Sequence, residues 1–183
     1  MKRLEKLSLL TALIEKLRAK GSWCGETHIQ KTVYFLQELL EVPTEFKFIL
    51  YKHGPFSFDL RSELTEMQAD GLLELETKTP LYGSSLILTD WGKSIQKSYN
   101  DTLTNYKEKL DFIVDKLGDK NVIELEKLAT ALYITIKHPN EIADVKAKRI
   151  NTIKPHIPIS DAENAVKNLS KIMSEVKPIS IEP

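Results

Sequence analysis

Residues 72–91 read LLELETKTPLYGSSLILTDW, and this stretch decides the fold. Leucine alternates with glutamate over 73–76, which is typical of a β-strand that buries one face and exposes the other. Proline and glycine lie in the turn-like segment 79–84, and a second apolar run at 85–88 predicts the partner strand. The stretch therefore predicts a β-hairpin, and Thr89 is placed to cap the helix that follows it.

Three helices and one strand are predicted before this hairpin. Each helix has apolar residues at three- and four-residue spacing, and the strand alternates aromatic and aliphatic residues. Thr27 and Gln30 have the spacing of a capping box. The expected elements are a helix over 1–20 ended by Gly21, a helix from Thr27 toward Pro43, a strand over 46–52, and a helix from Ser57 to Gly71.

Helix, helix, strand, helix, hairpin and helix follow one another in the order of a winged helix-turn-helix. We therefore expect residues 1–98 to form a winged helix-turn-helix domain whose wing is the hairpin. The helix that starts at Trp91 is expected to run without a break through residue 99. It is then shared with the second half of the chain.

Residues 99–183 are predicted to be wholly helical and to pack as a lobe on the first domain. Capping-box spacing is found at Asn121 with Glu124 and again within Ser160–Glu163. The expected helices are one over 106–117, one from Asn121 to before Pro139, one over 140–153, and one opened by Ser160. The predicted fold class is mainly α with a small β-hairpin (α+β), a winged helix-turn-helix followed by an all-helical C-terminal lobe.

Composition narrows the classes of function. The 183 residues include 26 basic and 26 acidic ones, so no net charge attracts nucleic acid or an anionic membrane as a whole. No apolar run approaches the roughly 20 residues that span a bilayer. A single cysteine, Cys24, excludes an internal disulfide framework and a cysteine-based zinc site. We expect a cytoplasmic protein without membrane contact or cofactor.

Two segments of the first half carry a resemblance to a known family. Residues 25–36 read Gly-x-Thr-x-Ile-Gln-Lys-x-Val-Tyr-Phe-Leu, and residues 51–57 read Tyr-Lys-His-Gly-Pro-Phe-Ser. Together with the segments 125–133 and 153–156, they resemble the YwgA-type winged-helix proteins of bacteria and archaea. The SocA-like Panacea domain of antitoxins and proteolytic adaptors is a more distant likeness. The resemblance implies a winged helix without a known catalytic site, and in the Panacea branch a protein-binding role, with a setting in phage defence as an expectation.

The third predicted helix and the turn before it form the candidate partner-binding surface. Most of its charged residues are acidic, which opposes the counterion release that phosphate contacts require and favours a basic protein partner. Two aromatic rings flank the predicted cap Ser57 and are either core or a hydrophobic contact. The candidate residues are Phe56, Phe58, Asp59, Arg61, Glu63, Glu66 and Asp70.

A DNA-binding regulator is the alternative. It would act as a dimer through Lys31, Lys52, Arg61 and Lys93. A second basic run stands in the C-terminal half, where it supports the helix ends or contacts an acidic surface, such as the third helix of another copy in a homodimer. Its residues are Lys137, Lys146, Lys148, Arg149 and Lys154.

An enzyme is not expected. Cys24 and His28 are four residues apart, a spacing that could pair a nucleophile with a base, but no third residue that would orient the base is recognisable from its spacing. A small buried thiol is the simpler interpretation of Cys24. The four histidines are scattered, without a metal-ligand pair, and the seven glycines are isolated, without a phosphate-binding loop.

Overall fold

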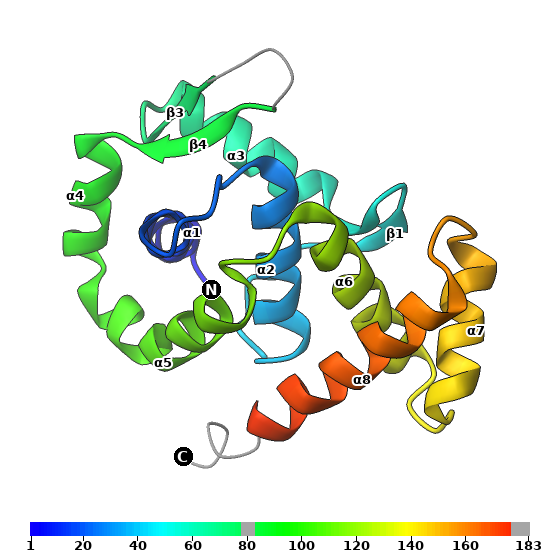
Figure 1. The fold of residues 1–183 in the computed structure, drawn as a ribbon. Coiled ribbons are helices and arrows are strands. Elements are labelled where there is room, and N and C mark those ends of the chain that lie inside the picture. The colour runs from blue at the N-terminus through cyan, green and yellow to red at the C-terminus, as the bar shows by residue number, and fades with distance from the viewer. Residues whose placement is uncertain (78–82, 177–183) are drawn as a thin grey trace. The chain divides into compact units, whose positions relative to one another are not determined.

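The computed structural model of the chain describes residues 1–77 and 83–176, so the predicted turn at 79–84 lies mostly outside the described residues (Figure 1). The chain is mainly helical with two small antiparallel sheets of two strands, which confirms the α+β class. The elements are α1 (Arg3–Ala19), α2 (Glu26–Glu38), β1 (Ile49–Tyr51), β2 (Gly54–Phe56), α3 (Phe58–Ala69), β3 (Leu73–Glu76), β4 (Ser85–Leu88), α4 (Asp90–Ser98), α5 (Asn100–Leu117), α6 (Val122–Lys137), α7 (Ala143–Ile153) and α8 (Ile159–Val176).

The chain divides into two compact units. Unit 1 comprises residues 1–47 and 57–120, and unit 2 comprises residues 48–56 together with the chain from 121 onward. The boundary that the sequence predicted, between residues 98 and 99, falls inside unit 1. The reason is that α5 packs on α1 and α2 instead of joining the later helices.

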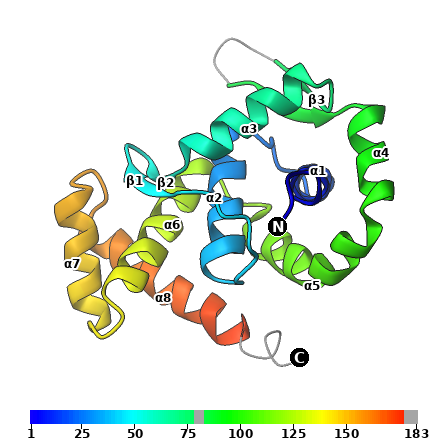
Figure 2. The same ribbon diagram turned by 180° about the vertical axis from the view of Figure 1, so that it is seen from behind.

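Helix α1 is the centre of unit 1. Its leucines Leu7, Leu9, Leu10, Leu13 and Leu17 are all buried, and they face more than one side of the helix. A helix that is apolar nearly all round is buried on all sides. Accordingly, α1 packs on β4, α4 and α5, and Figures 1 and 2 both show it beside α4 and α5.

The predicted hairpin is confirmed in the strands β3 and β4. They pair antiparallel, with Leu73 opposite Leu88 and Glu76 opposite Ser85. The segment between α1 and α2 lies along the far edge of β4, because the Leu86 N–H donates to the Cys24 carbonyl and Gly25 forms a β-bridge with Ser85.

The strand predicted over 46–52 was too long. Only Ile49–Tyr51 of this segment form a strand, which pairs with Gly54–Phe56 as a second hairpin that belongs to unit 2. Phe46 is excluded from the strand because its backbone groups bond to Gln37 of α2. The Phe46 N–H donates to the Gln37 Oε1 at 2.9 Å, and the Gln37 Nε2 donates to the Phe46 carbonyl at 3.0 Å. Gly54, at φ 83°, supplies the left-handed turn conformation that a side chain disfavours.

Several local signals are confirmed and three are wrong. Side-chain caps are present at Ser57, Thr89 and Asn121, as expected. The helix expected to pass residue 99 is instead interrupted at Tyr99, where φ is −122° and ψ is 34°, so α4 and α5 are separate. Gly25 rather than Thr27 is the N-cap of α2, and α8 begins at Ile159, ahead of the expected cap at Ser160.

Unit 2 is built on α6. This helix packs against β2, α7 and α8, and α7 packs on α8 (Figure 2). The buried side chains Leu125, Leu128, Ala129 and Leu132 follow the helical period along α6. Helix α6 therefore provides the common surface on which the other elements of unit 2 assemble.

Candidate interaction surfaces

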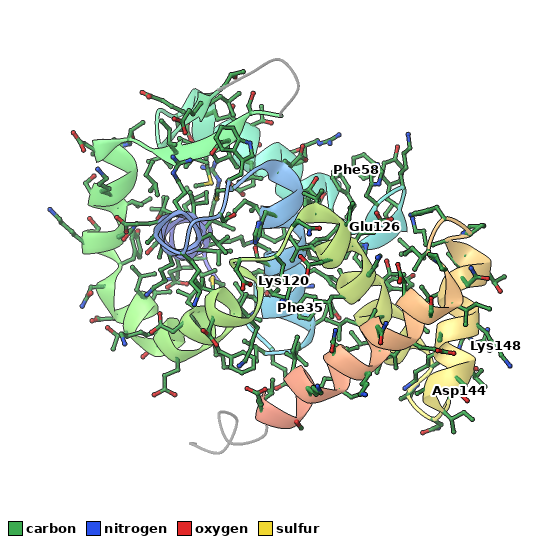
Figure 3. The ribbon with its side chains drawn as sticks, in the orientation of Figure 1. Phe35, Phe58, Lys120, Glu126, Asp144 and Lys148 are labelled. Atoms are coloured by element: carbon green, nitrogen blue, oxygen red, sulfur yellow. The ribbon has the colours of Figure 1, made fainter. Side chains whose placement is uncertain are left out.

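The third predicted helix is α3, and its outer surface is acidic as the sequence predicted. The Ser57 hydroxyl caps the helix by accepting the Leu60 N–H at 3.2 Å. One face of α3 is buried through Leu60, Leu64 and Met67. Phe58, labelled in Figure 3, is 49% exposed at the first turn.

Two carboxylates of α3 and the carboxylate of its C-cap, Asp70, hold one guanidinium group from α1. Arg3 lies 2.9 Å from Glu63, 3.0 Å from Glu66 and 3.6 Å from Asp70. The pKa of Arg3 is raised, mainly by the charge of Glu63. The cation that lies closest to the acidic face is thus already engaged by it.

The one cation of α3 itself is held in a similar way. Arg61 donates two hydrogen bonds to the Glu26 carboxylate of α2, at 2.7 and 3.1 Å, the paired geometry in which arginine binds a carboxylate most strongly. Asp59 is exposed in the first turn of α3. On and against α3 there are consequently five carboxylates and two guanidinium groups, and each guanidinium is in contact with carboxylate oxygens.

Two glutamines of α2 attach the chain that leads from α2 to α3. Gln30 is fully buried, donates to the Ser57 carbonyl at 2.9 Å and accepts the Ser57 N–H at 2.9 Å. Gln37, seven residues or about two turns further on, makes the same pair of bonds to Phe46. Gln30, the first residue of the Gln-Lys-x-x-Tyr segment, thus has a structural role, because its two bonds position Ser57, the N-cap of α3.

The lysines of the DNA-binding alternative are scattered. Lys31 is only 2% exposed, so its ammonium group is not presented at the surface. Lys93 is exposed and lies 3.3 Å from Asp90 on the same helix, and Lys52 is exposed at the turn between β1 and β2. Lys31 and Lys93 lie in unit 1, whereas Lys52 lies in unit 2. The described residues of unit 1 therefore do not bring the three lysines together on one surface.

The basic run of the C-terminal half is largely engaged within unit 2. Lys146 is 9% exposed, and Arg149 donates to the Glu141 carboxylate through two nitrogens, at 2.6 and 2.5 Å. The ammonium group of Lys137 lies 5.8 Å from the centre of the Tyr133 ring. Lys148, labelled on α7 in Figure 3, is exposed. Of this run, Lys137 and Lys148 are exposed without a described carboxylate partner, so the predicted anion-binding surface is smaller than expected.

Lys154 is part of a polar cluster that the sequence did not reveal. Its ammonium group donates to the carbonyls of Tyr51 and Lys52, at 2.5 and 2.6 Å. Burial lowers the pKa of Lys154, and the nearby charge of Glu126 raises it in part. The side chain holds the turn of the β1–β2 hairpin.

The Glu126 carboxylate completes this cluster. Its side chain on α6 (Figure 3) is 11% exposed and is flanked by His156, with Nε2 at 3.1 Å, and His53, with Nδ1 at 3.5 Å. The sequence signal that could have indicated this cluster was the resemblance to the YwgA-type proteins, because the segments 51–57 and 153–156 are both part of that resemblance. These two segments, about a hundred residues apart, meet around Glu126 and Lys154.

Replacing Lys154 with methionine is expected to lower the free energy of unfolding by about 1–2 kcal/mol, because two turn carbonyls lose a charged donor. Chemical denaturation followed by circular dichroism measures the change. Lys148→Met is the matched control on an exposed lysine, and we expect it to alter stability by less than about 0.5 kcal/mol. Equal effects of the two substitutions contradict a holding role for Lys154.

Cys24 and His28 do not form a nucleophile and base. Burial raises the pKa of the Cys24 thiol to about 12, so it stays protonated at neutral pH. His28 is used elsewhere: its Nε2 donates to the Leu117 carbonyl at 2.9 Å, and its Nδ1 lies 2.8 Å from the Ser22 hydroxyl. Burial lowers the pKa of His28, with smaller opposing effects from Leu117 and Asp119.

The lowered pKa of His28 predicts acid sensitivity. The folded protein resists protonation of the His28 ring. The neutral ring therefore contributes its full stabilisation above the pKa of about 6.5 that it has in the unfolded chain. This stabilisation is lost as the pH falls through the lower pKa of the folded state. We expect unfolding free energies measured at about pH 7.5 and 5.5 to differ less in His28→Gln than in the wild type. His138→Gln is the control, and a pH dependence unchanged by His28→Gln contradicts the assignment.

No family model matches the chain, and no curated protein matches it. Among the described residues, no group of three or more His, Cys, Asp or Glu is arranged to hold a metal ion, and no described helix is long and apolar enough to cross a bilayer.

Proposed function

We propose that this chain is a non-enzymatic winged-helix module that binds a protein partner, in the manner of an antitoxin, an adaptor or an accessory subunit of a defence system. The order of elements in unit 1 supports the winged helix: α1, the Cys24–Gly25 segment on β4, α2, α3, and then the hairpin β3–β4 as the wing. The resemblance to the Panacea proteins supports the protein-binding role, and the single cysteine, Cys24, supports a cytoplasmic setting.

The charge distribution on α3 is the observation that carries the proposal. In a winged helix this helix is the element that enters the major groove. Here its outer surface presents Asp59, Glu66 and Asp70, while Arg61 is held by Glu26. Each useful phosphate contact needs a cation that displaces counterions, and carboxylates at the same surface repel the phosphates. A basic protein surface fits α3 better than a duplex does.

Fluorescence anisotropy with a labelled random duplex tests the proposal. We expect no measurable binding at about 50 mM salt, where phosphate-led binding is much stronger than at 200 mM. Salt-sensitive binding at 50 mM contradicts the proposal and supports the DNA-binding regulator. In that event the variants Arg61→Ala, Lys52→Ala and Lys93→Ala identify the surface that contacts the phosphates.

A further inference from the structure

The chain passes from unit 1 to unit 2 and back through a short hairpin. It leaves unit 1 after Lys47, forms β1 and β2 within unit 2, and returns to unit 1 at Ser57. We define residues 48–56 as the strap. Each of its strands has three residues, and an isolated two-stranded hairpin is at best marginally stable in water. The conformation of the strap therefore depends on the groups that hold it.

Both ends of the strap are attached to α2 of unit 1. Two residues before the strap, the backbone of Phe46 bonds to the Gln37 side chain. Directly after the strap, the N–H and carbonyl of Ser57 bond to the Gln30 side chain, and both of these residues are fully buried. Ser57 is also the N-cap of α3. The strap therefore ends where α3 begins.

The turn of the strap is attached to unit 2. The Lys154 ammonium group donates to the carbonyls of Tyr51 and Lys52, and Lys154 is only 7% exposed. Helix α6 packs on β2 of the same hairpin. Because a buried charged donor that loses its acceptors is costly, this attachment holds the turn in place.

The arm between the turn and α3 is short and stiff. It consists of β2, Gly54–Phe56, which extends over about 10 Å. The Pro55 ring fixes its own φ angle, which removes part of the freedom with which the arm could absorb a displacement. A movement of the turn consequently reaches Ser57, whose hydroxyl and carbonyl accept the N–H groups of Leu60 and Arg61.

We propose that the strap couples unit 2 to the N-terminus of α3, so that release of the hairpin turn from Lys154 loosens the first turn of α3. The coupling runs along the chain and requires no contact between the units. Since α3 is the surface that the proposed function assigns to the protein partner, the strap is a regulatory element of that surface, and in this respect the inference rests on the proposed function.

Amide hydrogen exchange of the full chain tests the coupling in Lys154→Met. We expect exchange at Leu60 and Arg61, which bond to Ser57, to rise at least about threefold more than exchange in α1, which reports the loss of stability common to unit 1. Lys148→Met is the matched control on an exposed lysine and should leave these rates as in the wild type. Exchange at the two amides that rises no more than in α1 overturns the inference.

Slack in the arm separates coupling along the strap from other effects of the substitution. Inserting two glycines between Phe56 and Ser57 lengthens the arm by about 7 Å without removing either attachment. In this background Lys154→Met should no longer speed exchange at Leu60 and Arg61 relative to α1. An effect that persists despite the slack overturns the inference.

Gln30→Leu measures the coupling in the opposite direction and keeps the test decisive if Lys154→Met does not fold. Because coupling is reciprocal, loosening Ser57 should speed exchange at the amides of β1 and β2 more than in α8, the reference helix of unit 2. Strap amides that change only as α8 does overturn the inference. These measurements contain no partner, so their failure leaves the proposed function intact, whereas duplex binding overturns the proposed function and not the coupling.

Discussion

Gly92→Ala is expected to lower the free energy of unfolding by about 3 kcal/mol or more. A Cβ at this position would lie 2.3 Å from the Leu72 carbonyl oxygen and 3.0 Å from the Leu88 side chain. The carbonyl cannot move easily, because it accepts hydrogen bonds from Thr89. Helix α4 must then move away from the β3–β4 hairpin. Thermal and urea denaturation followed by circular dichroism measure the loss.

The direction of this effect distinguishes packing from helix propensity. Within an exposed helix, replacing glycine by alanine stabilises by about 1 kcal/mol. A neutral or stabilised Gly92→Ala variant therefore contradicts the close packing of α4 on Leu72. Gly83→Ala is the matched control, because a Cβ there meets no atom within 4 Å, and we expect no loss of stability from it.

Gln30→Leu is expected to cost about 2–3 kcal/mol of unfolding free energy. The leucine has a similar volume, but it leaves the buried Ser57 N–H without an acceptor, while the Ser57 carbonyl keeps only its helical bond from Arg61. Since Ser57 caps α3, we also expect faster hydrogen exchange in the first turn of α3. Urea denaturation and amide exchange measure the two effects.

Gln37→Leu is the comparison with a partly buried glutamine. Gln37 makes the same two bonds, to Phe46, and also accepts the Thr44 hydroxyl at 2.7 Å, but its side chain is only partly buried, so water can replace part of the lost amide. We expect a loss of about 1 kcal/mol, smaller than for Gln30→Leu. If the two substitutions lower the free energy of unfolding equally, burial is not the reason why the Gln30 bonds to Ser57 stabilise the protein.

The local signals of the sequence predicted most of the elements. Alternating Leu and Glu at 73–76 identified the hairpin, and Ser57, Thr89 and Asn121 are caps as expected. Each of these features depends on residues at most four positions apart, so a single sequence contains the information. The acidic character of α3 could be predicted for the same reason, since the spacing of Leu60, Leu64 and Met67 determines which side chains face outward.

Errors arose where a distant residue competes with a local preference. Phe46 has the character of a strand residue, yet its backbone N–H and carbonyl bond to the Gln37 amide, and β1 begins only at Ile49. Lys31 and Lys154 looked like surface cations, but both are buried. Local propensity cannot show such partners, because tertiary contacts between remote residues outweigh it.

The sequence by itself determined most of the helices, the β3–β4 hairpin and the excess of carboxylates on α3, because periodicity, capping and charge are properties of neighbouring residues. Only the tertiary structure decided which of those charges are already paired, through Arg3 and Glu26. It also brought Glu126, His53 and Lys154 together from three separate segments. The physical reason is that hydrogen bonds and ion pairs depend on distances in space. For residues far apart in the sequence, these distances are fixed only when the buried faces of the helices and strands pack together.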